Sequence, residues 1–127
     1  MIDRFHHLFI APADFDASLA FYRDVLGWTI IENWQTQGKA RGVIFSSGGM
    51  KLVLAEREEP LAATDPGVGR PHLHLDIHDI DARFRELPKG THIVTEPEET
   101  HWGTRWFVVR DPDGNLIAFE ELHRRSG

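Results

Sequence analysis

The sequence repeats itself with a fixed offset of 65 residues. Residues 7–17 (HLFIAPADFDA) align without a gap on residues 72–82 (HLHLDIHDIDA), and residues 49–56 (GMKLVLAE) align on residues 114–121 (GNLIAFEE) at the same offset. Similar strand and helix starts alone would not give two separated blocks one common register. The chain is therefore expected to contain two copies of one structural unit.

Each copy shows the same order of elements, namely one strand, one helix and three strands. Alternating side chains predict strands over 7–11 and 72–77. Asp14 and Asp79 stand where a helix N-cap places a side-chain oxygen on free backbone amides, and Gly27 is suited to end the first helix. Further strands are expected at 29–34, 41–45 and 51–56, and at 91–95, 105–110 and 116–122.

A Pro/Gly-rich stretch over 58–70 is typical of a linker, and it separates module one (1–57) from module two (71–122). A unit of about 55 residues cannot bury one face of its sheet alone and needs a partner. We therefore expect a single α+β domain over 1–127. In it, two tandem βαβββ modules form a curved mixed sheet around a cleft, with the helices on the convex side.

Composition excludes several classes of protein. With no cysteine, the chain has no disulfides, thiolate metal sites or cysteine nucleophiles. The net charge of −6 argues against a nucleic-acid partner, and no apolar run approaches the ~20 residues of a membrane-spanning helix. The negative charge would suit a cationic ligand, although acidity for solubility alone is the simpler explanation. We expect a cytoplasmic protein without a secretory signal.

Three segments resemble a known superfamily. They are FYRDVLGW (21–28), HLHLDIHDIDA (72–82) and DPDGNLIAFEE (111–121), and the DPDG portion also predicts a tight turn. These segments resemble the vicinal oxygen chelate superfamily, which includes glyoxalase I, extradiol dioxygenases and the bleomycin- and fosfomycin-resistance proteins. Since they are scaffold motifs, the resemblance identifies the fold and not the reaction.

In metal-using members, the resemblance implies four ligands, one from the first strand and one from the last strand of each module. They are commonly His or Gln, and Glu. His7 and His72 fall on the two first-strand positions, whereas Val53 and Ala118 fall on the two last-strand positions. Because alkyl side chains cannot bind a metal, the expected site keeps both imidazoles and lacks both carboxylates. Two imidazoles alone hold a divalent ion poorly, so we expect no cofactor.

A displaced divalent metal site is the alternative. Alternation places His74 on the face of His72 and Glu120 on the face of Ala118, two residues further along each strand. The candidate metal ligands are then His7, His72, His74 and Glu120. The favoured interpretation is that the histidines are hydrogen-bonded groups lining the cleft.

Aromatic and charged side chains near the expected cleft suggest a ligand site. Trp102 is the candidate for an aromatic wall against a planar ligand, with a core or dimer-interface position as the alternative. Arg105 could pair with an anionic ligand group, with a solvated strand charge as the alternative. The candidate ligand-binding residues are His7, Phe9, His72, His74, Trp102, Arg105 and Glu120.

Three functions follow from these residues. The first is a binding protein of the resistance type that sequesters a small, partly aromatic organic molecule without metal. The second is a metal-dependent lyase, isomerase or dioxygenase, in which Glu120 is the catalytic base or a ligand. The third is a structural or regulatory dimer without a small ligand. The sequence leaves enzymatic activity open, and we expect a homodimer with no nucleic-acid or membrane partner.

Overall fold

The computed structural model describes residues 1–37, 40–57 and 71–122. The chain forms two compact units, Met1–Thr64 and Asp65–Gly127, and each contains one four-stranded sheet. The linker predicted at 58–70 lies outside the described residues. No helix in the described part of the chain is long and apolar enough to cross a membrane.

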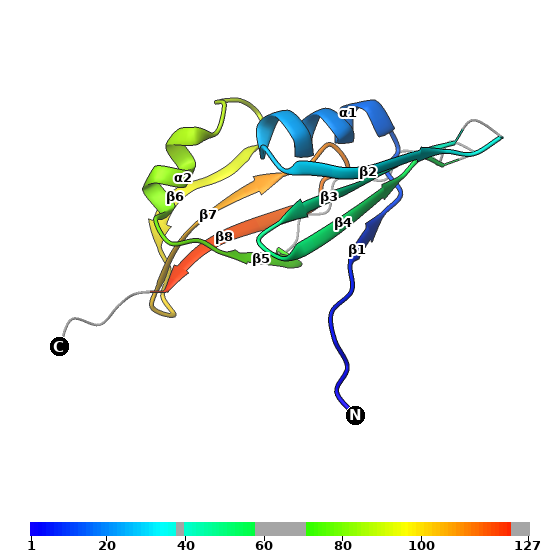
Figure 1. The fold of residues 1–127 in the computed structure, drawn as a ribbon. Helices are drawn as coiled ribbons and strands as arrows, with labels where there is room; N and C mark the ends of the chain where they lie inside the picture. The colour runs from blue at the N-terminus through cyan, green and yellow to red at the C-terminus, as the bar shows by residue number, and fades with distance from the viewer. Residues whose placement is uncertain (38–39, 58–70, 123–127) are drawn as a thin grey trace. The chain divides into compact units, whose positions relative to one another are not determined.

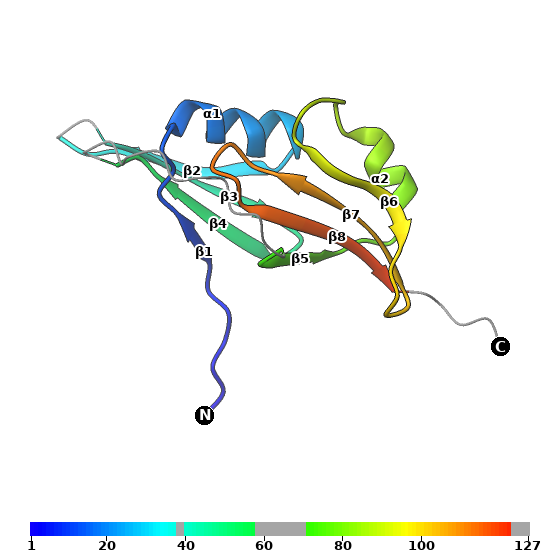
Figure 2. The same ribbon diagram turned by 180° about the vertical axis from the view of Figure 1, so that it is seen from behind.

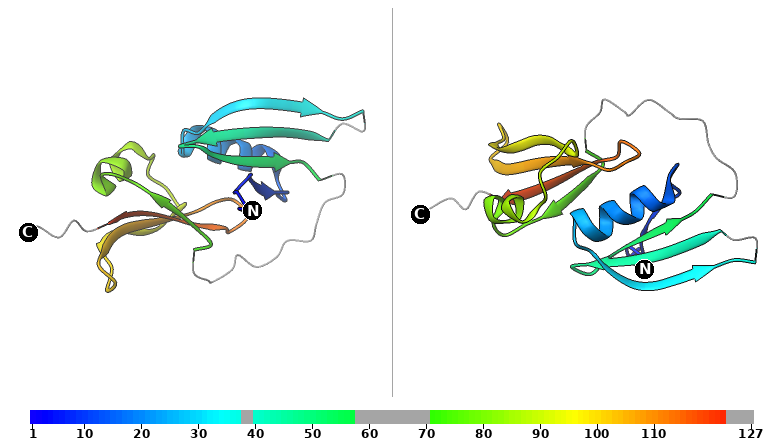
Figure 3. Two further views of the ribbon diagram at one scale, coloured as in Figure 1. Left: turned by 60° about the horizontal axis from the view of Figure 1, so that its bottom comes forward. Right: turned by 90° about the horizontal axis from the view of Figure 1, so that it is seen from above.

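The first unit follows the predicted element order. Its elements are β1 (Leu8–Ile10), α1 (Phe15–Ala20), a π-helical turn η1 (Phe21–Val25), β2 (Thr29–Gln35), β3 (Arg41–Ser47) and β4 (Met50–Ala55). The strand order in the sheet is β1-β4-β3-β2, with β1 parallel to β4 and the other neighbours antiparallel (Figure 1). Helix α1 lies along one face of this sheet (Figure 3).

The second unit repeats this topology. Its elements are β5 (Leu73–Asp76), α2 (Ile80–Glu86), β6 (Ile93–Glu99), β7 (Thr104–Arg110) and β8 (Leu116–Leu122). The strand order is β5-β8-β7-β6, again with one parallel pair, β5 and β8 (Figure 2). The predicted α+β class and the two tandem βαβββ modules are therefore confirmed. The cleft between the modules stays a prediction.

Both helices begin at the predicted N-caps, and the first helical segment ends at the predicted glycine. The Asp14 carboxylate accepts a hydrogen bond from the backbone N–H of Ala17 at 3.0 Å, and Asp79 accepts one from Ala82 at 3.1 Å. These bonds satisfy amides that the first helical turn would otherwise leave free. Gly27, with φ of +72°, ends the first helical segment in the left-handed conformation that glycine adopts without strain.

The tight turn expected before the last strand is also present. One carboxylate oxygen of Asp111 accepts hydrogen bonds from the backbone N–H groups of Asp113 and Asn115, at 2.9 and 2.8 Å. Gly114 takes a φ of +86° within this turn. The DPDGN motif therefore fixes the turn that leads from β7 into β8.

Side-chain alternation divides the second sheet into two faces. Phe107 of β7 and Phe119 of β8 stack with ring centroids 4.6 Å apart, and Phe84 of α2 packs on Phe107. This face, covered by α2, forms the core of the unit. Trp106 and Glu120 are direct partners across β7 and β8, each one position from a phenylalanine of the core. Their side chains therefore stand on the face opposite α2.

Candidate ligand-binding site

Glu120 of β8 is the centre of a hydrogen-bond cluster on the face opposite α2. One carboxylate oxygen, Oε2, accepts a bond from the indole N–H of Trp102 at 3.0 Å and one from the Thr104 hydroxyl at 2.8 Å. The other oxygen, Oε1, accepts a bond from Nδ1 of His74. Both oxygens of the carboxylate are therefore engaged by protein donors.

Strand register explains why these side chains meet. In the parallel pair β5 and β8, His74 lies opposite Ala118 and Asp76 lies opposite Glu120. On the other side of β8, Trp106 lies opposite Glu120. Thr104 precedes Trp106 by two residues on β7 and shares its face. Three neighbouring strands thus present polar and aromatic groups around one carboxylate.

Two opposing effects act on the charge of Glu120. Partial burial of the carboxylate is the largest effect, and it acts to raise the pKa. The hydrogen bonds from Trp102, His74 and Thr104 stabilise the ionised form, and together they hold the pKa of Glu120 below its usual range. Glu120 is therefore an anion at neutral pH.

Trp102 and Trp106 form a right-angled pair that we call the aromatic corner. Their ring centroids lie 5.0 Å apart and their planes meet at 89°. Trp106 also donates its indole N–H to the Glu98 carboxylate at 3.0 Å. The imidazole of His74 lies nearly parallel to Trp106, with 6.3 Å between the centroids. Each ring of the corner is thus oriented by a carboxylate.

The loop that carries Trp102 is fixed by local hydrogen bonds. The Thr100 hydroxyl accepts a bond from the backbone N–H of Thr104 at 2.9 Å, and the two hydroxyl oxygens lie 2.8 Å apart. Between them, Gly103 takes a φ of +92°, which allows the tight turn. The loop therefore holds Trp102 above β8 through its backbone as well as through Glu120.

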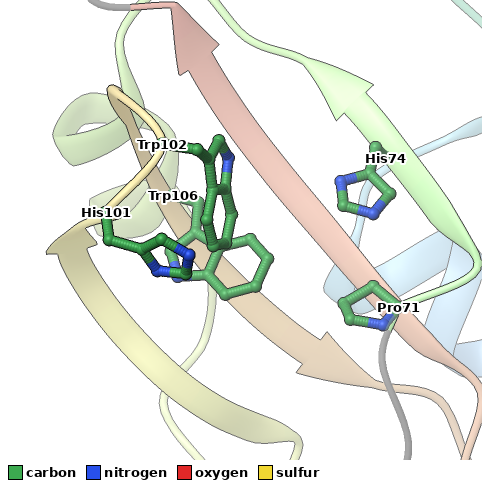
Figure 4. A pocket seen from close by; sticks show the side chains of 5 residues that line it. All are labelled: Pro71, His74, His101, Trp102 and Trp106. Carbon is green, nitrogen blue, oxygen red and sulfur yellow. The ribbon is translucent and has the colours of Figure 1, made fainter.

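A cavity of about 510 Å³ lies against the aromatic corner. It is lined by Pro71, His74, His101, Trp102 and Trp106. Figure 4 shows the tryptophans and His101 on one side of β8, and His74 and Pro71 on the other. A second hollow of about 240 Å³ shares His74 and is lined also by Asp76, Thr104 and Glu120. The larger cavity has the size and aromatic lining usual for small-molecule pockets.

The structure brings three of the candidate residues, His74, Trp102 and Glu120, into direct contact. Arg105 is not part of this contact group. The Arg105 guanidinium makes two hydrogen bonds to Asp81 of α2, at 3.0 and 2.8 Å, and a 3.5 Å ion pair with Glu99. Arg105 therefore links β7 to helix α2. His72, exposed just before β5, does not line the cavity.

The remaining candidates, His7 and Phe9, belong to the first unit. His7 shares a short hydrogen bond with its neighbour His6, with 2.6 Å between the two Nδ1 atoms. Phe9 is 61% exposed and pairs with Val53, at the place where the second unit pairs His74 with Ala118. Among the residues that the structure describes, the polar cluster thus belongs to the second unit and has no counterpart in the first. The predicted approach of His7 to His72 and His74 stays a prediction.

Sequence reasoning missed Thr104 and the role of Trp106. Both lie on β7 on the face of Glu120. The alternation of TRWFVVR, in which Phe107 and Val109 are buried against the core, would have placed Thr104 and Trp106 on this face. The position of Glu98 could not be predicted from alternation. The pairing of β6 with β7 is irregular between Thr95 and Glu98, so the register shifts before Glu98.

Comparison with known proteins identifies the family. Residues 4–119 match the model of the Glyoxalase/Bleomycin resistance protein/Dioxygenase superfamily, and the chain belongs to this superfamily. Virulence protein STM3117 of Salmonella typhimurium is 30% identical over 128 residues, which cover 95% of this chain and 85% of that protein.

Solved structures share the fold. The crystal structure of SMU.1112c matches with a TM-score of 0.75 at 22% identity, over 95% of this chain and all of that one. The structure of lactoylglutathione lyase from Agrobacterium tumefaciens matches with a TM-score of 0.62 at 27% identity, over 95% of each chain. The first match shows the fold alone, because its identity is low.

The described residues of the site lack part of the ligand set for the divalent metal that members of this superfamily usually bind. Ala118, beside His74 in the strand register, supplies a methyl group where a carboxylate would be needed. Glu120 already accepts hydrogen bonds at both oxygens. Within residues 1–37, 40–57 and 71–122, no three His, Asp or Glu side chains are grouped to hold a metal ion.

Proposed function

We propose that the chain binds a small, planar, partly aromatic organic molecule at the aromatic corner, without a metal ion. The observation that carries this proposal is the cavity of about 510 Å³ against Trp102 and Trp106. A planar ring can stack on the face of one indole while the other indole contacts its edge. His74 lies within reach of polar groups on such a ligand.

Preorganisation supports a binding role for the corner. Trp102 is 49% exposed, yet its indole is held by Glu120 and its loop by Thr100. An exposed aromatic side chain that is already fixed loses little conformational freedom when a ligand arrives. The hydrogen bonds to Glu120 and Glu98 thus keep two indole faces available in one geometry.

Quinoline, a neutral bicyclic aromatic compound, is a suitable probe for this proposal. We expect it to shift the indole N–H resonances of Trp102 and Trp106 in nitrogen-15 NMR spectra of the metal-free protein. Trp102→Ala should weaken binding about fivefold, since a stacked aromatic pair contributes roughly 1 kcal/mol. Trp102→Phe keeps an aromatic face and should lose less. Equal affinity of both variants and the wild type would contradict the proposal.

A metal-dependent lyase, isomerase or dioxygenase is the second candidate. The observation that favours it is the direct contact of His74 with Glu120, since both are common metal ligands. Elemental analysis of protein purified without chelators separates the two candidates. Stoichiometric metal that is lost in Glu120→Gln would support the enzyme, whereas metal-free protein that binds quinoline supports the binding role.

A further inference from the structure

We propose that the ligand at the aromatic corner is an organic cation, with a quaternary or protonated nitrogen in or beside a planar ring. This inference rests on the proposed function, because it names the chemical class of ligand for the same cavity. It is carried by the aromatic corner together with three carboxylates around it, Asp76, Glu98 and Glu120.

The Glu120 carboxylate is held by side chains that carry no permanent positive charge. Its hydrogen-bond donors are the neutral Trp102 and Thr104 and the imidazole of His74. Among the described residues, no Lys or Arg side chain forms an ion pair with Glu120. Asp76, its partner in the strand register, adds a second carboxylate to the same hollow.

Arg105, the cationic side chain next to Trp106 in the sequence, faces the other way. Arg105 lies between Thr104 and Trp106 on β7, and its guanidinium is bound to Asp81 and Glu99. Of the described residues that line the two hollows, none is Lys or Arg. We therefore expect a negative electrostatic potential at the cavity, which would favour a cation and disfavour an anion.

The tryptophans themselves strengthen this preference. Each indole of the corner donates its N–H to a carboxylate, Trp102 to Glu120 and Trp106 to Glu98. A hydrogen bond to an anion polarises the donor and leaves more electron density on the ring. A cation held over an indole face is attracted by that density, most strongly for tryptophan. Stacking and charge thus act on the same ligand.

The first unit provides a comparison within the same chain. At the 65-residue offset, Phe9 replaces His74 and Ala55 replaces Glu120. Gly42 takes the strand position of Trp106, and Trp34 packs directly over it. Because this unit lacks both the carboxylate and the corner, we expect one cation site per chain.

Three probes of similar size and different charge test the inference. They are N-methylquinolinium, a cation; quinoline, which is neutral in mildly alkaline buffer; and naphthalene-2-sulfonate, an anion. Calorimetric titration of the full-length protein should give one site per chain and an affinity about tenfold higher for the cation than for quinoline. The anion should bind most weakly. The indole N–H resonances of Trp102 and Trp106 should shift with the cation.

The outcomes separate this inference from the proposed function. Equal affinities for the three probes, or a preference for the anion, would overturn the proposal that the ligand is a cation. The proposed aromatic binding site would still stand. Failure of all three probes to shift the two indole resonances overturns both.

A matched pair of variants tests the role of the carboxylate. Glu120→Gln removes the charge and keeps one of the two acceptor oxygens, and it should lower the affinity for N-methylquinolinium about tenfold, a larger loss than it causes for quinoline. Glu86→Gln makes the same charge change on α2, across the sheet, and should leave both affinities unchanged. Equal losses in the two variants, or no loss in Glu120→Gln, would overturn the assignment.

Discussion

The indole N–H of Trp102 donates a 3.0 Å hydrogen bond to the carboxylate of Glu120. This bond joins the loop between β6 and β7 to the middle of the second sheet. It orients the indole that lines the cavity, and it also helps to keep Glu120 ionised. Ligand binding and local stability are therefore coupled through one pair of residues.

The strength of this pair can be measured with a double-mutant cycle. Trp102→Phe removes the N–H and should lower the free energy of unfolding by about 1 kcal/mol, as expected for a hydrogen bond to a charged group at a partly exposed site. In the Glu120→Gln background the same change should have a smaller effect. Urea denaturation of the four proteins gives the coupling energy. Strict additivity would show that the bond does not contribute to stability.

Glu120 should also make stability depend on pH. Because its folded-state pKa is lowered, its ionised form stabilises the fold above the unfolded value of about 4.3, and this contribution is lost as pH falls through the folded pKa. The stability difference between the wild type and Glu120→Gln should therefore be largest near neutral pH and shrink in acid. Denaturation curves of both proteins over this range check it. A difference that grows in acid would contradict the lowered pKa.

Arg105 is expected to act in folding and not in ligand binding. Arg105→Lys loses the two-pronged contact with Asp81, so the melting temperature should fall slightly while the affinity for N-methylquinolinium stays the same. Arg41→Lys is the matched change in the first unit, where Arg41 contacts Asp16 and Glu56. Loss of binding to naphthalene-2-sulfonate in Arg105→Lys alone would instead support pairing of Arg105 with an anionic ligand.

Gly42 is required by the packing of Trp34. A Cβ atom at this position would lie 2.0 Å from the indole ring, which must then move. Gly42→Ala should shift the indole N–H resonance of Trp34 and lower the free energy of unfolding by about 1–3 kcal/mol, the usual effect of overpacking. Gly48→Ala is the control for the resonance: its added Cβ meets no atom within 4 Å, and although its φ of +53° disfavours alanine, the Trp34 resonance should not shift. An unchanged Trp34 resonance in Gly42→Ala would contradict this packing.

Much of the fold could be predicted because the repeat carries local signals. Asp14 and Asp79 are N-caps in the structure as in the sequence, and β8 has the predicted bounds. These features depend on residues close in the chain. The π-helical turn at Phe21–Val25 was not predicted, because the spacing of apolar residues does not distinguish it from an α-helix.

The site could be predicted only in part. Alternation placed His74 and Glu120 on one face, and they are in contact. The position of Trp102 over Glu120 depends on the loop at 100–103, and the pairing of Arg105 with Asp81 joins a strand to a helix. Such contacts between segments that are not adjacent strands do not follow from periodicity.

The central claim is that the aromatic corner binds a planar ligand without a metal ion. It is tested most directly by titrating N-methylquinolinium into protein treated with a chelator and following the Trp102 indole N–H resonance by NMR. We expect the resonance to shift to saturation in the treated protein, and added zinc, nickel or manganese to leave the affinity unchanged. A shift that occurs only after one of these ions is restored would contradict the claim.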